Sequence, residues 1–181
     1  MRADAALTRM TTPDLAGDGV YLRALARADE ALYVQVHASP EAMRHVGDPL
    51  DVVTARSRFS RAIELASAAD TTYRMWTVVV PGEEAGIGIS LLMTTGPCAE
   101  IGIMLLPAWQ RRGIGRRVLD AMVEYGFDRL GLPAIESRQR NGNMGWQRVM
   151  EQSGFKRIEG TPMPHEWLGW RRDQEMSVSV V

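Results

Sequence analysis

The sequence has few of the residues that hold together small secreted or metal-dependent proteins. Cys98 is the only cysteine among 181 residues, so an internal disulfide is excluded. A thiol nucleophile is not favoured either, because no His and Asp pattern accompanies Cys98. The three histidines, His37, His45 and His165, lack metal-ligand spacing, so we predict no metal site and interpret each as a locally satisfied side chain. One cysteine beside eleven methionines favours the cytoplasm.

The chain also lacks a strong net charge and a long apolar run. Its 21 basic and 22 acidic residues give a net charge of -1, which favours neither nucleic acid nor a membrane surface as a partner. No apolar stretch reaches the length of a membrane span, and the first residues lack the pattern of a secretory signal. With 45% apolar side chains, the sequence indicates a soluble globular protein. It does not determine the oligomeric state, and a homodimer is one possibility.

Turn residues and hydrophobic periodicity divide the chain into elements. Residues 1–19 have no periodicity and are predicted to be a flexible N-terminal segment, with residues 20–181 as a single domain. Residues 161–170 have no period, and residues 176–181 alternate as in an edge strand. Strands are predicted at 20–25, 72–80, 86–93, 99–105, 133–139 and 155–158, and helices at 27–38, 40–45, 51–69, 114–130 and 143–153. Three consecutive strands indicate an antiparallel meander, and the whole pattern indicates an α+β fold.

A loop rich in glycine and arginine precedes the clearest helix. It reads Gln110-Arg111-Arg112-Gly113-Ile114-Gly115 and is followed by Arg116 and Arg117. Unpaired N–H groups at a helix N-terminus attract anions, and glycines let a phosphate approach the backbone. Guanidinium groups suit phosphate oxygens. The loop therefore predicts a site for one or two phosphates.

Other interpretations of this loop fit less well. A P-loop requires Lys followed by Ser or Thr after its last glycine, where this chain has Arg116 and Arg117. A dinucleotide fingerprint would place glycine or alanine at Val118. Two further interpretations stay open. The segment could be an ordinary arginine-rich helix start whose glycines only form a turn. It could also be a helix-turn-helix contact with nucleic acid, although the balanced net charge of the chain disfavours this.

The segment from Gln110 to Gly115 resembles the Q/R-x-x-G-x-G/A signature of the GNAT superfamily of N-acetyltransferases. Ala99 to Ile103 resembles the central strand of that family, and Asn143 with Gly154-Phe155 resembles its N-x-x-S…G-F segment. Residues 20–25 and 39–45 resemble the branch that acetylates the N-termini of ribosomal proteins. The resemblance covers residues 20–158 and implies a mixed, mostly antiparallel central sheet flanked by helices, with a central splayed strand.

The resemblance also implies a cofactor, acetyl-coenzyme A, and the residues that bind it. The backbone of Ile103, Met104 and Leu105 would pair with the pantetheine arm, and the amide of Met104 or Leu105 would polarise the thioester carbonyl. Leu106 and Pro107 would mark the splay of the strand. Asn143 would bond to the pantetheine amides, with Asn141 as the other candidate. The pyrophosphate would be bound by Gln110, Arg111, Arg112, Gly113, Ile114, Gly115 and Arg116.

Two departures from the family pattern bear on the chemistry. Trp146 stands where the family often has serine, and Met150 stands where some members carry a tyrosine acid. The usual proton donor for the thiolate is therefore missing. The resemblance implies direct transfer of the acetyl group to a primary amine, of a peptide N-terminus or a small molecule. A non-catalytic acyl-coenzyme A sensor is the alternative.

The base that deprotonates the amine is not identified by a motif. Neutralising a lysine-like amine at pH 7 costs about 4 to 5 kcal/mol, and an α-amine about 1 kcal/mol, so a weak base suffices for the latter. Glu100 is the first candidate and Glu136 the second, although Glu100 could instead pair with an arginine such as Arg74. We expect the acceptor to be recognised by loops at residues 43–51 and 161–170.

Overall fold

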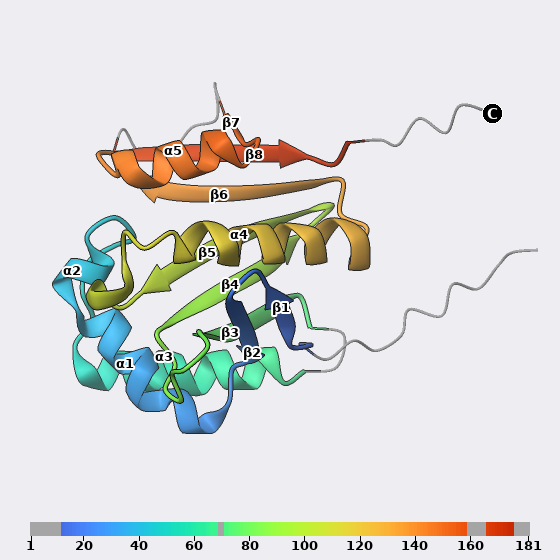
Figure 1. The fold of residues 1–181 in the computed structure, drawn as a ribbon. Coiled ribbons are helices and arrows are strands. Elements are labelled where there is room, and N and C mark those ends of the chain that lie inside the picture. The colour runs from blue at the N-terminus through green and yellow to red at the C-terminus, as the bar shows by residue number, and fades with distance from the viewer. Residues whose placement is uncertain (1–11, 69–70, 159–165, 176–181) are drawn as a thin grey trace, which may run out of the picture.

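The computed structural model describes residues 12–68, 71–158 and 166–175, and its centre is one eight-stranded sheet (Figure 1). The strands lie in the order β1-β2-β3-β4-β5-β6-β8-β7. They are β1 (Leu15–Gly17), β2 (Val20–Ala24), β3 (Tyr73–Val79), β4 (Gly88–Thr95), β5 (Cys98–Leu105), β6 (Ala134–Arg140), β7 (Lys156–Arg157) and β8 (Trp167–Asp173). The helices are α1 (Glu30–Ala38), α2 (Pro40–Met43), α3 (Val52–Ala66), α4 (Ile114–Glu124) and α5 (Met144–Gln152), and α4 continues into a π-helical turn at Tyr125–Arg129.

The sheet is mostly antiparallel and is split at its centre. β5 pairs with β4 along its full length, from Thr95↔Cys98 to Gly88↔Leu105. Its parallel pairing with β6 runs only from Ala99↔Ile135 to Ile101↔Ser137. Beyond that point the two strands separate, because β5 stays with β4 while β6 stays with β8. The predicted mixed, mostly antiparallel α+β sheet with a central splayed strand is confirmed.

The splay begins earlier along β5 than predicted. The sequence placed it at Leu106 and Pro107, at the end of the strand, but the last pair between β5 and β6 is Ile101↔Ser137. The signal at Pro107 marks instead the start of a short 3-10 turn at Pro107–Trp109. Proline ends a strand because it lacks an N–H group, whereas the splay arises from the diverging partners and leaves no mark in the sequence.

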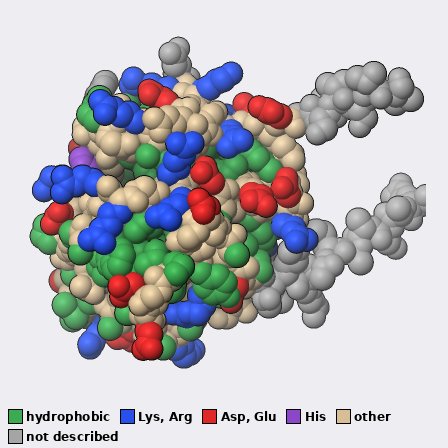
Figure 2. All heavy atoms as spheres, viewed as in Figure 1, with side chains coloured by type: hydrophobic (Ala, Val, Ile, Leu, Met, Phe, Trp, Pro, Cys, Tyr) green, Lys and Arg blue, Asp and Glu red, His purple; other side chains and the backbone are tan. Residues whose placement is uncertain are grey.

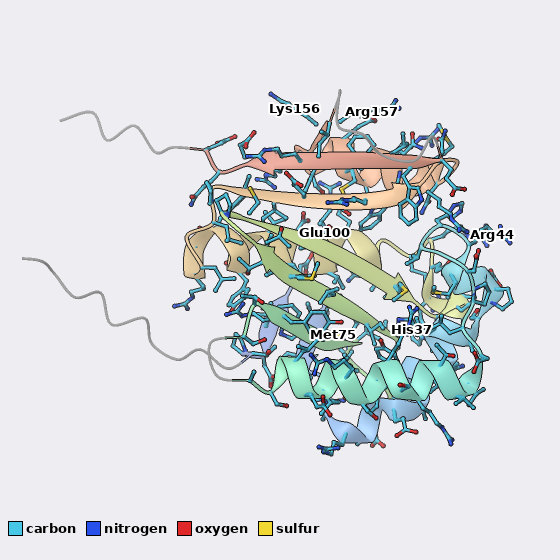
Figure 3. All side chains as sticks on the ribbon, turned by 180° about the vertical axis from the view of Figure 1, so that it is seen from behind. His37, Arg44, Met75, Glu100, Lys156 and Arg157 are labelled. Carbon is cyan, nitrogen blue, oxygen red and sulfur yellow. The ribbon has the colours of Figure 1, made fainter. Side chains whose placement is uncertain are left out.

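Each face of the sheet has its own hydrophobic core. On one face, α4 and α5 cover a core that includes Trp76, Leu119 and Met150. On the other, α1 and α3 cover a smaller core that includes Phe59, Met75 and Ile89. Figure 1 shows α4 in front of the sheet, and Figure 3, seen from behind, shows α3 in front of the lower strands. The split between β5 and β6 is therefore an opening in the sheet, with one layer of helices on each side of it.

Two strands lie where the sequence predicted none. Leu15–Gly17 forms β1 within the segment expected to be flexible, and it pairs with β2. Pro13 adds a further contact, because its carbonyl accepts a hydrogen bond of 2.6 Å from Trp76 Nε1. Trp167–Asp173 forms β8 between β6 and β7, although no strand was predicted there because the segment lacks alternating hydrophobicity. Residues 176–181, predicted as an edge strand, lie outside the described residues.

Candidate acetyltransferase site

A cavity of about 1070 Å³ lies at the split between β5 and β6 and reaches both faces of the sheet. We call its part beside α4 and α5 the loop side. It is lined by residues that include Gln110, Gly115, Asn143 and Trp146. We call the part beneath α1 and α2 the chamber, and its lining residues include Tyr33, His37, Tyr73, Met75 and Gly102. One continuous space thus joins the predicted anion loop to the opposite face.

The loop side is built on backbone conformations that expose N–H groups. Arg111 has φ 60° and Gly113 has φ 74°, both left-handed, and α4 begins at Ile114 directly after them. Left-handed residues beside a helix N-terminus turn successive amides toward one point and form an anion-binding concavity. Gln110 braces the loop, since its Nε2 donates a hydrogen bond of 2.9 Å to the Leu105 carbonyl. These backbone conformations are suited to binding an anion.

The predicted pyrophosphate residues do not all face the cavity. Gln110, Arg111, Gly113, Gly115 and Arg116 line it. The guanidinium of Arg112 instead lies 4.8 Å from the ring centre of Trp109, and Ile114 is buried in the core. Figure 2 shows basic side chains gathered on the left of this face, over the loop that precedes α4. The loop side therefore combines backbone amides with local positive charge.

Trp146 packs over Gly115 at the start of α4. A Cβ at Gly115 would lie 3.2 Å from Cζ3 of Trp146, closer than about nine in ten such contacts. The indole thus covers the first turn of α4, and both residues line the loop side of the cavity.

The structure separates the two asparagine candidates. Asn143 lines the cavity and caps α5, its Oδ1 accepting a hydrogen bond of 3.2 Å from the Trp146 amide. Asn141 is not among the described residues that line the cavity, and its Oδ1 accepts a hydrogen bond of 2.9 Å from the Gly142 amide. The Nδ2 group of Asn143 stays available because the cap uses only the oxygen.

The end of β5 supplies backbone rather than side chains. Ile103, Met104 and Leu105 all line the cavity and lie past the last pair with β6. Backbone groups alternate in direction along a strand, so those of Ile103 and Leu105 face the opening while those of Met104 face β4. An extended ligand can pair with this open edge as an added strand does. Met150 lies on α5 and is fully buried in the core.

Both predicted carboxylates are held in ion pairs. Glu100 lines the cavity, and its Oε2 lies 3.4 Å from Nη2 of Arg138 rather than near Arg74. Glu136 is not among the described cavity-lining residues, and its Oε1 accepts a hydrogen bond of 2.9 Å from Arg171. The structure therefore brings Glu100, and not Glu136, to the cavity.

Most of the chamber was not anticipated from the sequence. Tyr33 and His37 come from α1, and Tyr73 and Met75 come from β3. In Figure 3, His37 and Arg44 lie toward the end of the sheet where β5 ends, and Glu100 lies farther along the sheet face. The expected contribution of residues 43–51 is present, since Arg44, His45 and Val46 line the cavity. Of residues 161–170, Trp167 lines it, while His165 lies outside the described residues.

Burial and neighbouring charges alter the chamber's titratable groups. Burial raises the pKa of Tyr33 to about 12 and also raises the pKa of Tyr73, so both phenols stay protonated at neutral pH. Burial lowers the pKa of His37 and of His45, so both imidazoles are neutral at pH 7. The part of the chain that the structure describes contains no cluster of three metal-ligating side chains. It also contains no helix that could cross a membrane.

Comparison with known proteins identifies the family. Residues 20–156 match the family described as acetyltransferase (GNAT) domain. The chain belongs to this family, and it is accordingly an N-acetyltransferase. The resemblance inferred from the loop, from the central strand and from the asparagine segment is thereby confirmed.

Solved structures share the fold at low sequence identity. An acetyltransferase from Agrobacterium tumefaciens str. C58 has a TM-score of 0.78 and 24% identity, with 91% of this chain and 96% of that chain covered. RimL, a ribosomal L7/L12 alpha-N-protein acetyltransferase in complex with coenzyme A, has a TM-score of 0.73 and 16% identity, covering 89% and 98%. Spermidine N-acetyltransferase from Vibrio cholerae, in complex with CoA and spermine, has a TM-score of 0.69 and 20% identity, covering 84% and 93%.

Proposed function

We propose that this protein transfers an acetyl group from acetyl-coenzyme A directly to a primary amine. The observation that carries the proposal is the continuous cavity from the anion loop, past the open edge of β5, to the chamber. A phosphate-bearing donor bound on the loop side would reach the splay with its thioester, and an amine in the chamber would approach from the other face. Such an arrangement holds the two reactants in one orientation, which is a large part of catalysis.

Direct transfer needs no covalent intermediate on the protein. The amine nitrogen forms a bond to the acetyl carbon, the carbon–sulfur bond breaks, and one proton passes from nitrogen to the thiolate. Cys98 is not among the described residues that line the cavity, and its Sγ accepts a hydrogen bond of 3.5 Å from Nη1 of Arg171. The amide of Leu105 faces the open edge of β5 and would donate to the carbonyl oxygen as its negative charge develops, whereas the backbone of Met104 faces β4.

The chamber supports an α-amine at a peptide N-terminus, or a small amine with an apolar arm, as the acceptor. Its floor is apolar and aromatic, and the charges of Glu41 and Glu100 are balanced by Arg44 and Arg138. A polyamine would be better matched by an excess of carboxylates. An α-amine also costs less to deprotonate than a lysine-like amine.

Thiol release in the presence of acetyl-coenzyme A tests the proposal. We expect the protein to release free thiol with at least one member of a panel of N-terminal peptides and small primary amines. Gly115→Glu places a bulky anion against Trp146 at the phosphate site, and we expect it to weaken coenzyme A binding by about 100-fold or more, close to 3 kcal/mol. Ser60→Glu adds the same charge at an exposed position of α3 and should bind normally.

The alternative function is an acyl-coenzyme A sensor without turnover. It would follow from the missing tyrosine acid that the resemblance implies at Met150, a residue fully buried in the core. The sensor would bind coenzyme A by calorimetry yet release no thiol with any amine of the panel. Absence of binding at saturating concentration would contradict both functions. The low cysteine content supports the cytoplasm as the place where either function operates.

A further inference from the structure

Proton transfer is the part of the proposed reaction that the predicted residues leave unexplained. The attacking nitrogen must lose a proton, and the departing thiolate must gain one. Glu100 is held by Arg138, Glu136 lies away from the cavity, and Met150 cannot donate a proton. A group that can both accept and release a proton must therefore come from elsewhere in the chamber.

His37 has a fixed orientation in the chamber wall. It lies in the last turn of α1 and is 8% exposed. Its Nδ1 lies 2.9 Å from the Tyr33 carbonyl oxygen, and its ring stacks on the Tyr33 ring with centroids 4.0 Å apart and planes 26° apart. A carbonyl oxygen only accepts hydrogen bonds, so Nδ1 carries the hydrogen in the neutral ring.

The other ring nitrogen is left for a ligand. With the hydrogen on Nδ1, Nε2 presents a lone pair, and no described residue donates a hydrogen bond to it. His37 also lines the same cavity as Gly102 and Glu100. A buried imidazole with one nitrogen anchored and the other unpaired is the arrangement that orients a histidine for acid–base work.

We infer that Nε2 of His37 takes the proton from the attacking amine and returns it to the leaving thiolate. This inference rests on the proposed acetyl transfer. As the nitrogen–carbon bond forms, the nitrogen becomes positively charged and acidic, and its proton moves to Nε2. As the carbon–sulfur bond breaks, the same proton moves from Nε2 to sulfur. The products are the amide and free coenzyme A thiol, and His37 is neutral again.

The surroundings of His37 keep it neutral before the reaction. Burial lowers its pKa below 6.5, the hydrogen bond to Tyr33 opposes this effect, and the charge of Arg58 lowers the pKa further. The other titratable and charged groups of the chamber are Tyr73 on β3, Glu41, Arg44 and His45 at α2, and Glu100 and Arg138 on the sheet. A neutral imidazole is the form that can accept a proton, so kcat should be constant at neutral pH and fall only in an acidic range that lies below the ordinary histidine pKa of 6.5.

Substitution of His37 tests its role. We expect His37→Gln, which keeps a polar side chain but cannot carry a proton, to lower kcat by about 100-fold or more. The KM for acetyl-coenzyme A and the calorimetric Kd for coenzyme A should stay within twofold of the wild type. His37→Ala should regain activity with added imidazole, and the regained rate should follow the pKa across a series of substituted imidazoles.

Three outcomes would overturn the inference while the proposed function stands. The first is a folded His37→Gln variant whose kcat lies within threefold of the wild type. The second is a kcat that still falls at acidic pH in this variant. The third is an imidazole-restored rate of His37→Ala that does not depend on the pKa of the added imidazole. If both variants fail to fold, long-range ¹H–¹⁵N spectra of the wild-type protein decide, because hydrogen on Nε2 rather than Nδ1 contradicts the assignment. If wild-type protein releases no thiol with any amine, the proposed function itself fails.

Discussion

Gly102 is the residue at which the two reactants would meet. It lies on β5 immediately after the last pair with β6, it lines the chamber, and a Cβ built on it meets no atom within 4 Å. Elsewhere on the sheet glycine relieves crowding, as at Gly88, where a Cβ would clash with the Met104 carbonyl oxygen. At Gly102 the missing side chain instead leaves space in the cavity.

We predict that Gly102→Val separates acceptor binding from donor binding. The branched side chain should raise the KM for the amine by about tenfold or more, corresponding to ~1.4 kcal/mol. The Kd for coenzyme A should change by less than twofold, and the melting temperature should rise because a strand glycine is costly. Gly102→Ala is the matched control and should show a smaller effect on KM. An unchanged KM in Gly102→Val would place the acceptor elsewhere.

The motif residues show how far single positions could be interpreted from the sequence. The spacing of Gly113 and Gly115 predicted a phosphate loop, because only certain residues tolerate those backbone angles and contacts. It could not show that Gln110 bonds to the Leu105 carbonyl or that Arg112 stacks on Trp109, since side-chain direction depends on neighbours outside the motif. His37 was interpreted as a locally satisfied histidine, and in the structure its Nδ1 is paired with the Tyr33 carbonyl oxygen.

Among the elements, α5 has a cap residue, Asn143, that serves two functions. Asn143 caps the helix through Oδ1 and lines the loop side of the cavity. Loss of an asparagine cap typically costs about 1 kcal/mol, whereas serine caps equally well. The two tasks can therefore be separated by substitution.

We predict that Asn143→Ser keeps the helix cap but weakens coenzyme A binding. The loss of the Nδ2 donor should raise the Kd by about fivefold to tenfold, the equivalent of one hydrogen bond of ~1 to 1.4 kcal/mol. Chemical unfolding should show a stability within about 0.5 kcal/mol of the wild type. Asn143→Ala should lose both the helix cap and the hydrogen bond to coenzyme A. A normal Kd in Asn143→Ser would limit Asn143 to its capping role.

Element prediction succeeded where periodicity was strong and failed where neighbours decide the structure. The amphipathic pattern of α4 and the turns of the meander were sufficient to place α4 and β3 to β5. β8 was missed because Trp167–Asp173 places the buried Leu168 and Trp170 beside charged residues without alternation. Its strand conformation depends on pairing with β6 along its length and with β7 at Trp170 and Arg171. β1 has three residues and depends on β2 and on contacts to α4. The chamber could not be predicted, because distant segments converge there only after folding.

At the scale of the whole molecule, one ion pair with a buried carboxylate links stability to pH. Asp29 is 7% exposed, and its Oδ1 lies 2.7 Å from Nη2 of Arg23. Burial by itself raises the pKa of Asp29, but hydrogen bonds from Arg23 and the Ala26 amide outweigh it, and the net pKa is lowered below 3.8. A lowered carboxyl pKa contributes stability at neutral pH that is lost as the pH falls through the folded-state pKa.

We predict that Asp29→Asn destabilises the protein by about 1 to 3 kcal/mol at pH 7. The difference from the wild type should shrink below pH 4 and vanish once the carboxyl is protonated in both folded and unfolded chains. Urea unfolding at a series of pH values measures this. Asp18→Asn, at an exposed position, serves as control and should be nearly neutral. A constant difference between Asp29→Asn and wild type across the acidic range would contradict the linkage.

The split between β5 and β6 makes the free protein an unfinished sheet. Past Ile101, one side of β5 has no neighbouring strand, so its inward amides are hydrated although they lie at the centre of the molecule. They should exchange hydrogen with solvent as freely as those of an outer edge. Occupation of the cavity by a strand-like ligand would slow that exchange and make the two halves of the sheet unfold as one unit. The same gap that admits the reactants thus divides the free molecule into two parts that can loosen separately.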